Sequence, residues 1–156
     1  APRGDATICI QFVIDEQDVI HNLKWPDMMV GSDGIPDLRG KPHPRLFGTF
    51  AKILGHYVRD EAIMPLPEAI RRMTSLPAAT FGLTHRGMIK AGYHADLVLF
   101  DPKTIADQAT YDEPQTLATG IESVIVNGKV AFTKGQHQNA GSGQMLRYRK
   151  TAHTNP

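Results

Sequence analysis

The stretch from Met28 to Phe50 constrains the fold of this chain more than any other part of the sequence. A short apolar run, Met28 to Val30, leads into a Gly-Ser-Asp-Gly turn at residues 31–34, and a loop rich in proline and glycine follows. Parallel α/β proteins present catalytic groups where buried strands end, and glycines leave room for a ligand beside a carboxylate. The pattern predicts a strand at residues 28–30 that leads to a functional acid, Asp33, although Ser-Asp-Gly alone also fits an ordinary turn.

The residues before this turn complete a predicted βαβ unit. Residues 6–14 are nearly all apolar or β-branched, which is typical of a strand buried on both faces of a parallel sheet. A helical pattern begins at Asp15, with further acidic residues in its first turn, and Trp25-Pro26 ends it. This unit would place Asp33 at the carboxyl end of its second strand.

Two further helices are predicted after the loop. Residues 44–59 repeat their apolar side chains with a period of 3.6, which indicates a helix with a broad apolar face. Residues 66–76 repeat this pattern until Pro77 breaks it, and a short helical turn at residues 78–81 follows.

The second half of the chain favours strands and turns. Residues 97–100 are a short apolar run, and residues 121–126 and 129–132 flank Asn127-Gly128, the signature of a hairpin with a type I′ turn. The segment at residues 103–120 is polar and is interpreted as a loop. We therefore expect three parts, which are a helical α/β part, part of a small β-domain, and an extended, poorly ordered arm. Their predicted bounds are residues 1–84, 85–135 and 136–156.

Bulk properties exclude several classes of protein. The net charge of +1 gives no reason to expect a nucleic acid or a membrane surface as partner. No apolar run approaches the roughly 20 residues of a membrane span, and the chain does not open with a signal-peptide pattern. The single cysteine, Cys9, excludes an internal disulfide and fits a cytoplasmic setting, as it would fit a secreted protein without disulfides. With 156 residues the chain is too short for a complete (β/α)8 barrel of about 250 residues.

The turn also belongs to a longer series of motifs. HPRLFGTF follows it, and PLPEAIRRMTSLPAATFGL, RGMIKAGYHADLVLFDP and GIESVIVNGK come next in this order. Together they resemble the D-aminoacylase family (N-acyl-D-amino-acid deacylases) of the amidohydrolase superfamily, over about residues 19–149. The resemblance implies an α/β fold, namely the C-terminal portion of a metal-dependent (β/α)8 barrel followed by strands of a small β-sandwich domain. It also implies a piece of a longer enzyme whose N-terminal part is missing.

The resemblance implies roles for the residues around the turn. Asp33 matches the aspartate at the end of the last barrel strand, which is the general base and in many members also touches the metal. Arg45 looks like the arginine that pairs with the substrate α-carboxylate, which a planar guanidinium can hold through two parallel hydrogen bonds. Ser32, Gly34 and His43 are expected to complete the substrate-binding surface, and His43 could equally orient Asp33 or the loop, or serve a structural role.

The implied cofactor is Zn²⁺, which lowers the pKa of a bound water so that a carboxylate can take its proton. The family supplies a His-x-His pair, a bridging cysteine and two more histidines, but the seven histidines of this chain include no such pair and Cys9 is not at a matching position. We expect the complete enzyme to hydrolyse N-acyl-D-amino acids, and this chain alone to bind zinc weakly and be inactive. The expected partners are this small-molecule substrate and the missing N-terminal part, and a homo-oligomer stays open.

Two other interpretations stay open. A cyclic amide hydrolase such as a hydantoinase or dihydroorotase would use the same aspartate, although HPRLFGTF favours the deacylase. In a non-catalytic assembly module, Asp33 would be a turn residue and the apolar faces would pack on another chain.

Overall fold

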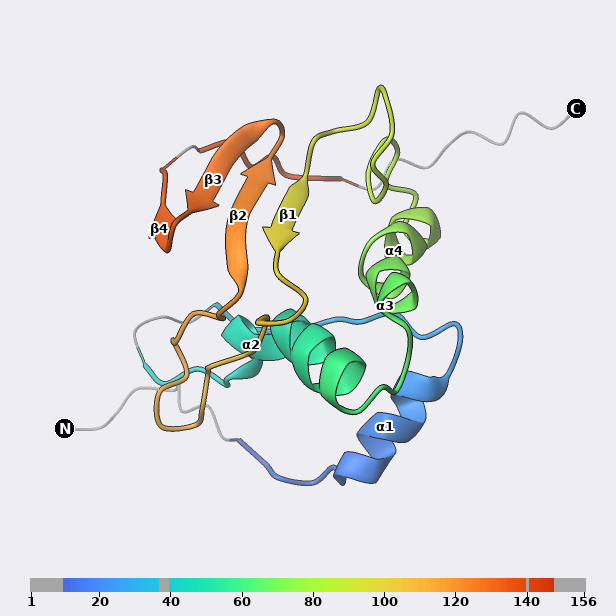
Figure 1. Ribbon diagram of the computed structural model, residues 1–156, viewed down its shortest axis with the longest axis vertical. Helices are drawn as coiled ribbons and strands as arrows, with labels where there is room; N and C mark the ends of the chain where they lie inside the picture. The colour runs from blue at the N-terminus through green and yellow to red at the C-terminus, as the bar shows by residue number, and fades with distance from the viewer. Residues whose placement is uncertain (1–9, 37–39, 140, 148–156) are drawn as a thin grey trace, which may run out of the picture.

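The computed structural model describes residues 10–36, 40–139 and 141–147, and in this part of the chain the helices come first and the strands follow. The chain thus combines helices with a small antiparallel sheet, and in the view of Figure 1 the sheet lies above α2 while α3 and α4 lie to its right. The elements are α1 (Glu16–Lys24), α2 (Arg45–Lys52), the π-helix η1 (Ile53–Asp60), α3 (Leu66–Met73), α4 (Ser75–Thr80), β1 (Leu97–Phe100), β2 (Ile121–Val126), β3 (Lys129–Thr133) and β4 (Gln136–His137). None of the helices described here is both long and apolar enough to cross a bilayer.

The first helix begins and ends as predicted. The Asp15 carboxylate accepts a hydrogen bond of 2.7 Å from the Gln17 N–H, which satisfies one of the free amides at the start of α1. At the other end the Trp25 N–H donates to the Asn22 carbonyl, and the chain then turns at Pro26. The sequence signals for this helix were local, and the structure confirms them.

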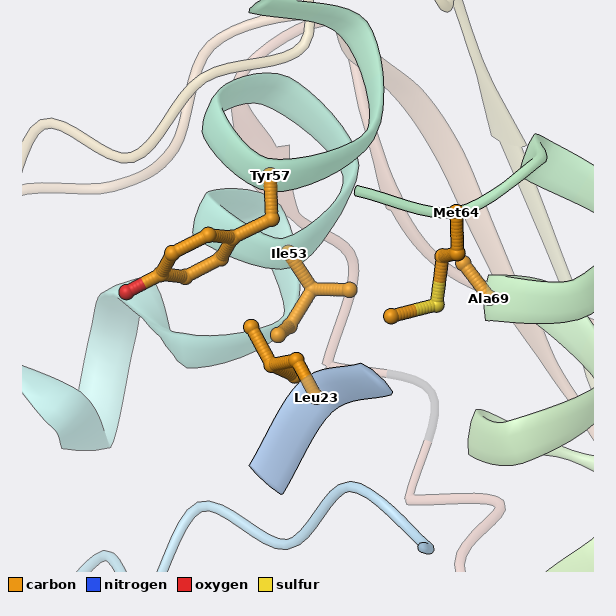
Figure 2. Packing of buried hydrophobic residues seen from close by; sticks show 5 residues of the cluster. All are labelled: Leu23, Ile53, Tyr57, Met64 and Ala69. Carbon is orange, nitrogen blue, oxygen red and sulfur yellow. The ribbon is translucent and has the colours of Figure 1, made fainter. Parts of the chain in front are cut away.

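The helix predicted at residues 44–59 is confirmed in extent, but its second half is a π-helix. A π-helix is wound more widely than an α-helix, with hydrogen bonds between residues five apart. This pattern continues to the end of η1, where the Glu61 N–H donates to the His56 carbonyl. The apolar face of η1 supplies Ile53 and Tyr57 to the core, where they meet Leu23 of α1. Figure 2 shows these side chains pointing toward one another, with Met64 and Ala69 closing the cluster from the side of α3.

The prediction that Pro77 breaks the next helix is wrong. The break lies at Thr74, whose φ of −133° and ψ of −84° leave the helical region and separate α3 from α4. Pro77 instead lies in the first turn of α4, where the backbone N–H that proline lacks would have had no acceptor within the helix. The helical turn predicted at residues 78–81 is therefore the second half of α4.

The two strands predicted for the βαβ unit are also wrong where the structure describes them. Residues 28–30 form no strand, and the Val30 N–H donates to the Arg72 carbonyl at the end of α3. Residues 10–14 are irregular and exposed, and residues 6–9 lie outside the described part of the chain. A parallel strand needs a neighbour to complete its hydrogen bonds, and every strand described here belongs to the antiparallel sheet.

The sheet has the strand order β1-β2-β3-β4, with each neighbouring pair antiparallel. The predicted hairpin is confirmed, because Asn127 and Gly128 adopt φ values of 47° and 78° between β2 and β3. β4 pairs with β3, so the sheet extends to His137, within the segment predicted as an arm. Residues 148–156 of that segment lie outside the described residues.

The connection between β1 and β2 is irregular, as predicted for residues 103–120, but it is not a solvated loop throughout. Ile105 is only 1% exposed, and its carbonyl accepts a 2.6 Å hydrogen bond from Arg59 of η1. Ala106 and Thr119 form an isolated β-bridge that closes the base of the connection. We call residues 105–115 the strap, because they run from this base back along η1 and α2 (Figure 1).

An ion-pair cluster ties α3 to α1. Arg72 is 5% exposed, donates from Nε to Glu68 Oε1 at 2.6 Å, and donates from Nη1 to the Leu23 carbonyl. Arg71 donates to the same carboxylate from Nε and Nη2. These hydrogen bonds to the two arginines lower the pKa of Glu68 from its usual 4.5 to about 2.

Stability should therefore depend on Glu68 in a defined pH window. Because the folded-state pKa is depressed, the pairing stabilises the fold fully above pH 4.5, and this contribution is lost as the pH falls toward about 2. We expect Glu68→Gln to lower the urea midpoint at pH 7 and to differ little from the wild type near pH 2. Glu122→Gln, at an exposed position of β2, is the matched control. An equal loss at both pH values for Glu68→Gln would contradict the prediction.

Candidate functional site

The Gly-Ser-Asp-Gly segment forms a tight turn against the start of α2. The Gly34 N–H donates to Ser32 Oγ at 3.2 Å, which closes the turn around Asp33. Asp33 has a φ of 47°, a left-handed conformation that aspartate tolerates better than most residues. A Cβ at Gly34 would lie 2.9 Å from Leu46 Cδ1 and 3.1 Å from Leu46 Cα. Glycine therefore lets this turn approach the α2 backbone without the small shift of Leu46 that a Cβ would require.

The structure brings Asp33 and Arg45 together. Arg45 is the first residue of α2, and its Nη2 lies 2.9 Å from Asp33 Oδ2. The Asp33 side chain is 85% exposed and the Arg45 side chain 36%, so the carboxylate faces open space while the guanidinium is partly enclosed. Among the described residues, Arg45 Nε is a buried donor without a hydrogen-bond partner. Such a donor costs about 1–3 kcal/mol if it stays unpaired.

His43 fixes the start of α2. Pro44 occupies the N-cap position and offers no side-chain acceptor, and the Arg45 N–H instead donates to His43 Nδ1 at 3.1 Å. Burial, and secondarily the charge of Arg45, lower the pKa of His43 below its ordinary value. The imidazole is therefore neutral at pH 7, with Nδ1 free to accept.

Tyr111, which sequence reasoning missed, completes the cluster. Its Oη lies 3.4 Å from His43 Nε2, and the two rings meet edge to face with centroids 5.3 Å apart. Tyr111 comes from the strap, far along the chain from the turn, so no local pattern connects it with His43. The available signal was a lone aromatic residue in an otherwise polar stretch.

The predicted residues thus form one cluster with two chemical functions. Asp33 presents an exposed carboxylate that can accept a proton, and Arg45 presents a guanidinium that can bind an anion such as a carboxylate. Ser32 and Gly34 shape the turn, and His43 positions the helix start. The arrangement suits a reaction in which a proton is removed close to a bound negative charge.

The donor set of the described residues does not fit a zinc site by itself. A catalytic zinc normally takes three protein ligands, and no group of three or more His, Cys, Asp or Glu side chains in residues 10–36, 40–139 and 141–147 could hold a metal ion. Asp33 could supply one carboxylate ligand. Its nearest charged partner here is a cation, Arg45, and not a second ligand.

A cavity of about 540 Å³ lies elsewhere, between α3–α4 and residues 83–93. Its lining is largely apolar, and its arginines are engaged, Arg71 with Glu68 and Arg86 with Asp96. None of the predicted site residues lines it. The cluster around Asp33 is therefore the stronger candidate site, although it is an open surface.

Comparison with known proteins gives consistent matches. A family model described as "Amidohydrolase family" matches residues 26–132, which include the whole cluster. D-aminoacylase from Alcaligenes xylosoxydans xylosoxydans is 53% identical over 133 residues, which are 82% of this chain and 27% of that protein. The chain therefore spans little more than a quarter of the length of this relative.

Two solved structures match in three dimensions as well. A crystal structure of D-aminoacylase is 48% identical with a TM-score of 0.82, over 85% of this chain and 28% of the other. N-acyl-D-glutamate deacylase from Bordetella bronchiseptica, solved with zinc and a phosphonate inhibitor that mimics the tetrahedral intermediate, is 47% identical with a TM-score of 0.76. That match covers 80% of this chain and 26% of the solved chain.

Proposed function

The chain belongs to the amidohydrolase family, and on this premise we propose that it supplies one part of the active site of a zinc-dependent N-acyl-D-amino-acid deacylase. The observation that carries the proposal is the contact between Asp33 and Arg45, which joins a proton acceptor to an anion-binding group. The similarity to D-aminoacylase and to a zinc-containing N-acyl-D-glutamate deacylase supports this reaction class. The reaction would release a D-amino acid and a carboxylate from the acylated substrate.

Each residue of the cluster has a role in this proposal. Asp33 accepts the proton of the attacking water and later returns it to the leaving amine, which would otherwise depart as an unstable anion. Arg45 holds the α-carboxylate of the substrate. Arg45 Nη2 engages Oδ2 of Asp33, and in this proposal the proton goes to the other carboxylate oxygen, Oδ1. Ser32, Gly34 and His43 line the substrate side of the turn and keep these two groups in place.

The rest of the catalytic centre would come from polypeptide outside this chain. The described residues contain no group of three or more side chains that could hold a metal ion, and the chain covers only 27% of the similar D-aminoacylase. Phe12, Val13 and Ile14 are 76%, 77% and 72% exposed, which supports burial of this segment by further protein. We infer that residues 1–84 are the end of a (β/α)8 barrel, residues 85–135 part of a small β-sandwich domain, and residues 136–156 an arm.

A substrate panel tests the proposed function. Zinc-loaded polypeptide that contains this chain in its natural context should hydrolyse N-acetyl-D-amino acids and leave the L-enantiomers, hydantoin and dihydroorotate unchanged. The 156-residue chain alone should bind far less than one zinc per chain by elemental analysis and should show no turnover. Turnover of the cyclic amides and not of the acyl amino acids would favour the cyclic amide hydrolase. If the zinc-loaded polypeptide hydrolyses neither class of substrate, both the deacylase and the cyclic amide hydrolase are contradicted.

A further inference from the structure

The strap packs against the α2–η1 helix at two glycines. Gly48 lies in α2 and Gly55 in η1, and both lie close to the strap. A Cβ at Gly55 would come within 2.5 Å of the Ile105 carbonyl oxygen, and a Cβ at Gly48 within 3.1 Å of Asp107 Cβ. The first residues of the strap, 105–109, therefore contact the helix closely at these two glycines.

The far end of the strap reaches the loop that precedes α2. Gln115 Nε2 donates to the Gly40 carbonyl at 3.1 Å, and Tyr111 Oη approaches His43 Nε2 at 3.4 Å. Phe12 also packs against the Tyr111 ring, with the ring centroids 4.8 Å apart. The Tyr111 ring therefore contacts both Phe12 and His43, and its hydroxyl lies within hydrogen-bond distance of His43 Nε2.

The hydrogen bonds at His43 determine its tautomer. Nδ1 accepts from the Arg45 N–H at 3.1 Å, so Nδ1 carries no proton. A neutral imidazole must then carry its proton on Nε2, which donates to Tyr111 Oη. A continuous chain of contacts thus runs from the strap through His43 to the first residue of α2.

We propose that Tyr111 is a positioning residue for Arg45, which it orients through His43. Holding the imidazole with Nδ1 toward the Arg45 N–H fixes the start of α2, and this start directs the guanidinium toward Asp33. The inference deepens the proposed function and rests on it, because Arg45 is there the group that binds the substrate carboxylate. A residue of the small β part would in this way set substrate affinity at a turn far from it in sequence.

Amide hydrogen exchange on the polypeptide that contains this chain in its natural context tests the positioning directly. Tyr111→Ala removes both the hydroxyl and the ring, so we expect the Arg45 amide to exchange roughly tenfold faster, the loss of about one hydrogen bond. Tyr111→Phe keeps the ring contact and should give a smaller increase. Tyr93→Phe is the matched control, because Tyr93 makes the same edge-to-face contact with another histidine, His85, away from Arg45. Unchanged Arg45 exchange in Tyr111→Ala, with the fold intact by circular dichroism, would overturn the proposal.

Kinetics in the zinc-loaded polypeptide separate this inference from the proposed function. A weakened carboxylate contact raises KM for N-acetyl-D-amino acids by roughly tenfold at nearly constant kcat, whereas general destabilisation lowers the amount of active enzyme and leaves KM unchanged. Tyr111→Phe should recover part of the KM of the wild type. If the wild type hydrolyses no acyl amino acid, the proposed function fails, and the exchange rates alone still decide whether Tyr111 positions Arg45. If exchange responds but KM does not, the role of Tyr111 in substrate binding is refuted.

Discussion

Replacing Asp33 by asparagine should lower kcat for N-acyl-D-amino acid hydrolysis by about 10²- to 10⁴-fold, the range typical of a lost general base. The amide has nearly the same shape as the carboxylate, and its oxygen can still accept from Arg45, so the turn should stay folded. What the variant loses is an oxygen basic enough to take a proton from water. KM should change much less than kcat, because the substrate carboxylate contact belongs to Arg45.

The design needs a control for the loss of one negative charge. Asp27→Asn removes the same charge from an exposed turn after α1, and we expect its kcat to stay within twofold of the wild type, a change of less than about 0.5 kcal/mol in the barrier. Both variants should be zinc-loaded and their metal content measured, since Asp33 could also be a ligand. If Asp33→Asn keeps more than a tenth of the wild-type kcat with full zinc content, Asp33 is not the base.

Sequence patterns predicted the elements whose determinants are local. Asp15 caps a helix because its side chain reaches an amide two residues away, and Asn127-Gly128 forms a hairpin because both residues tolerate a positive φ. The apolar period of residues 44–59 likewise predicted a helix. The break at Thr74 was missed because no common propensity marks it, whereas Pro77 carries a strong but misleading signal at a place where proline costs little.

The strands predicted in the first 30 residues illustrate the opposite case. An apolar run is consistent with a strand, but a strand exists only where another one lies beside it. Residues 28–30 instead find a partner in the Arg72 carbonyl, which no periodicity could have indicated.

Most residues of the candidate site could be named from local sequence, but their arrangement in space could not. Ser32, Asp33 and Gly34 are adjacent, and the motif that follows them carried His43 and Arg45, so these residues were named from the sequence. Their arrangement was not predictable, since the motif gives the order of Asp33 and Arg45 along the chain but not the contact between their side chains.

Tyr111 and Ile105 were hidden inside a segment interpreted as a polar loop. Their importance comes from contacts with residues more than 45 positions away, as in the hydrogen bond from Arg59 to Ile105. Composition averages a segment and therefore cannot show which of its residues is buried.

The second large prediction concerns the stability provided by the close packing of Gly120 against Ile105, the first residue of the strap. Gly120 has a φ of +76°, and a Cβ there would lie 2.5 Å from both Ile105 Cα and Ile105 N. Two effects should lower the free energy of unfolding in Gly120→Ala. Alanine disfavours the left-handed conformation by about 1–2 kcal/mol, and its Cβ would overpack against the Ile105 backbone at a cost of about 1–3 kcal/mol. We expect a loss of roughly 3 kcal/mol in the free energy of unfolding by urea, a large share of the 5–15 kcal/mol typical of a domain.

Two further alanine variants separate these causes. Gly135 has the same φ of +76° with nothing within 4 Å, so Gly135→Ala measures the conformational cost alone, about 1 kcal/mol. Gly55 is helical, where alanine is intrinsically favoured by about 1 kcal/mol, so any loss in Gly55→Ala reports the clash with the Ile105 carbonyl oxygen at 2.5 Å. If the free energy of unfolding falls by the same amount in all three variants, Ile105 does not pack as closely against Gly55 and Gly120 as the structure shows. If Gly120→Ala and Gly55→Ala also speed exchange of the Arg45 amide while Gly135→Ala does not, the seating of Ile105 and the orientation of Arg45 are coupled through the strap.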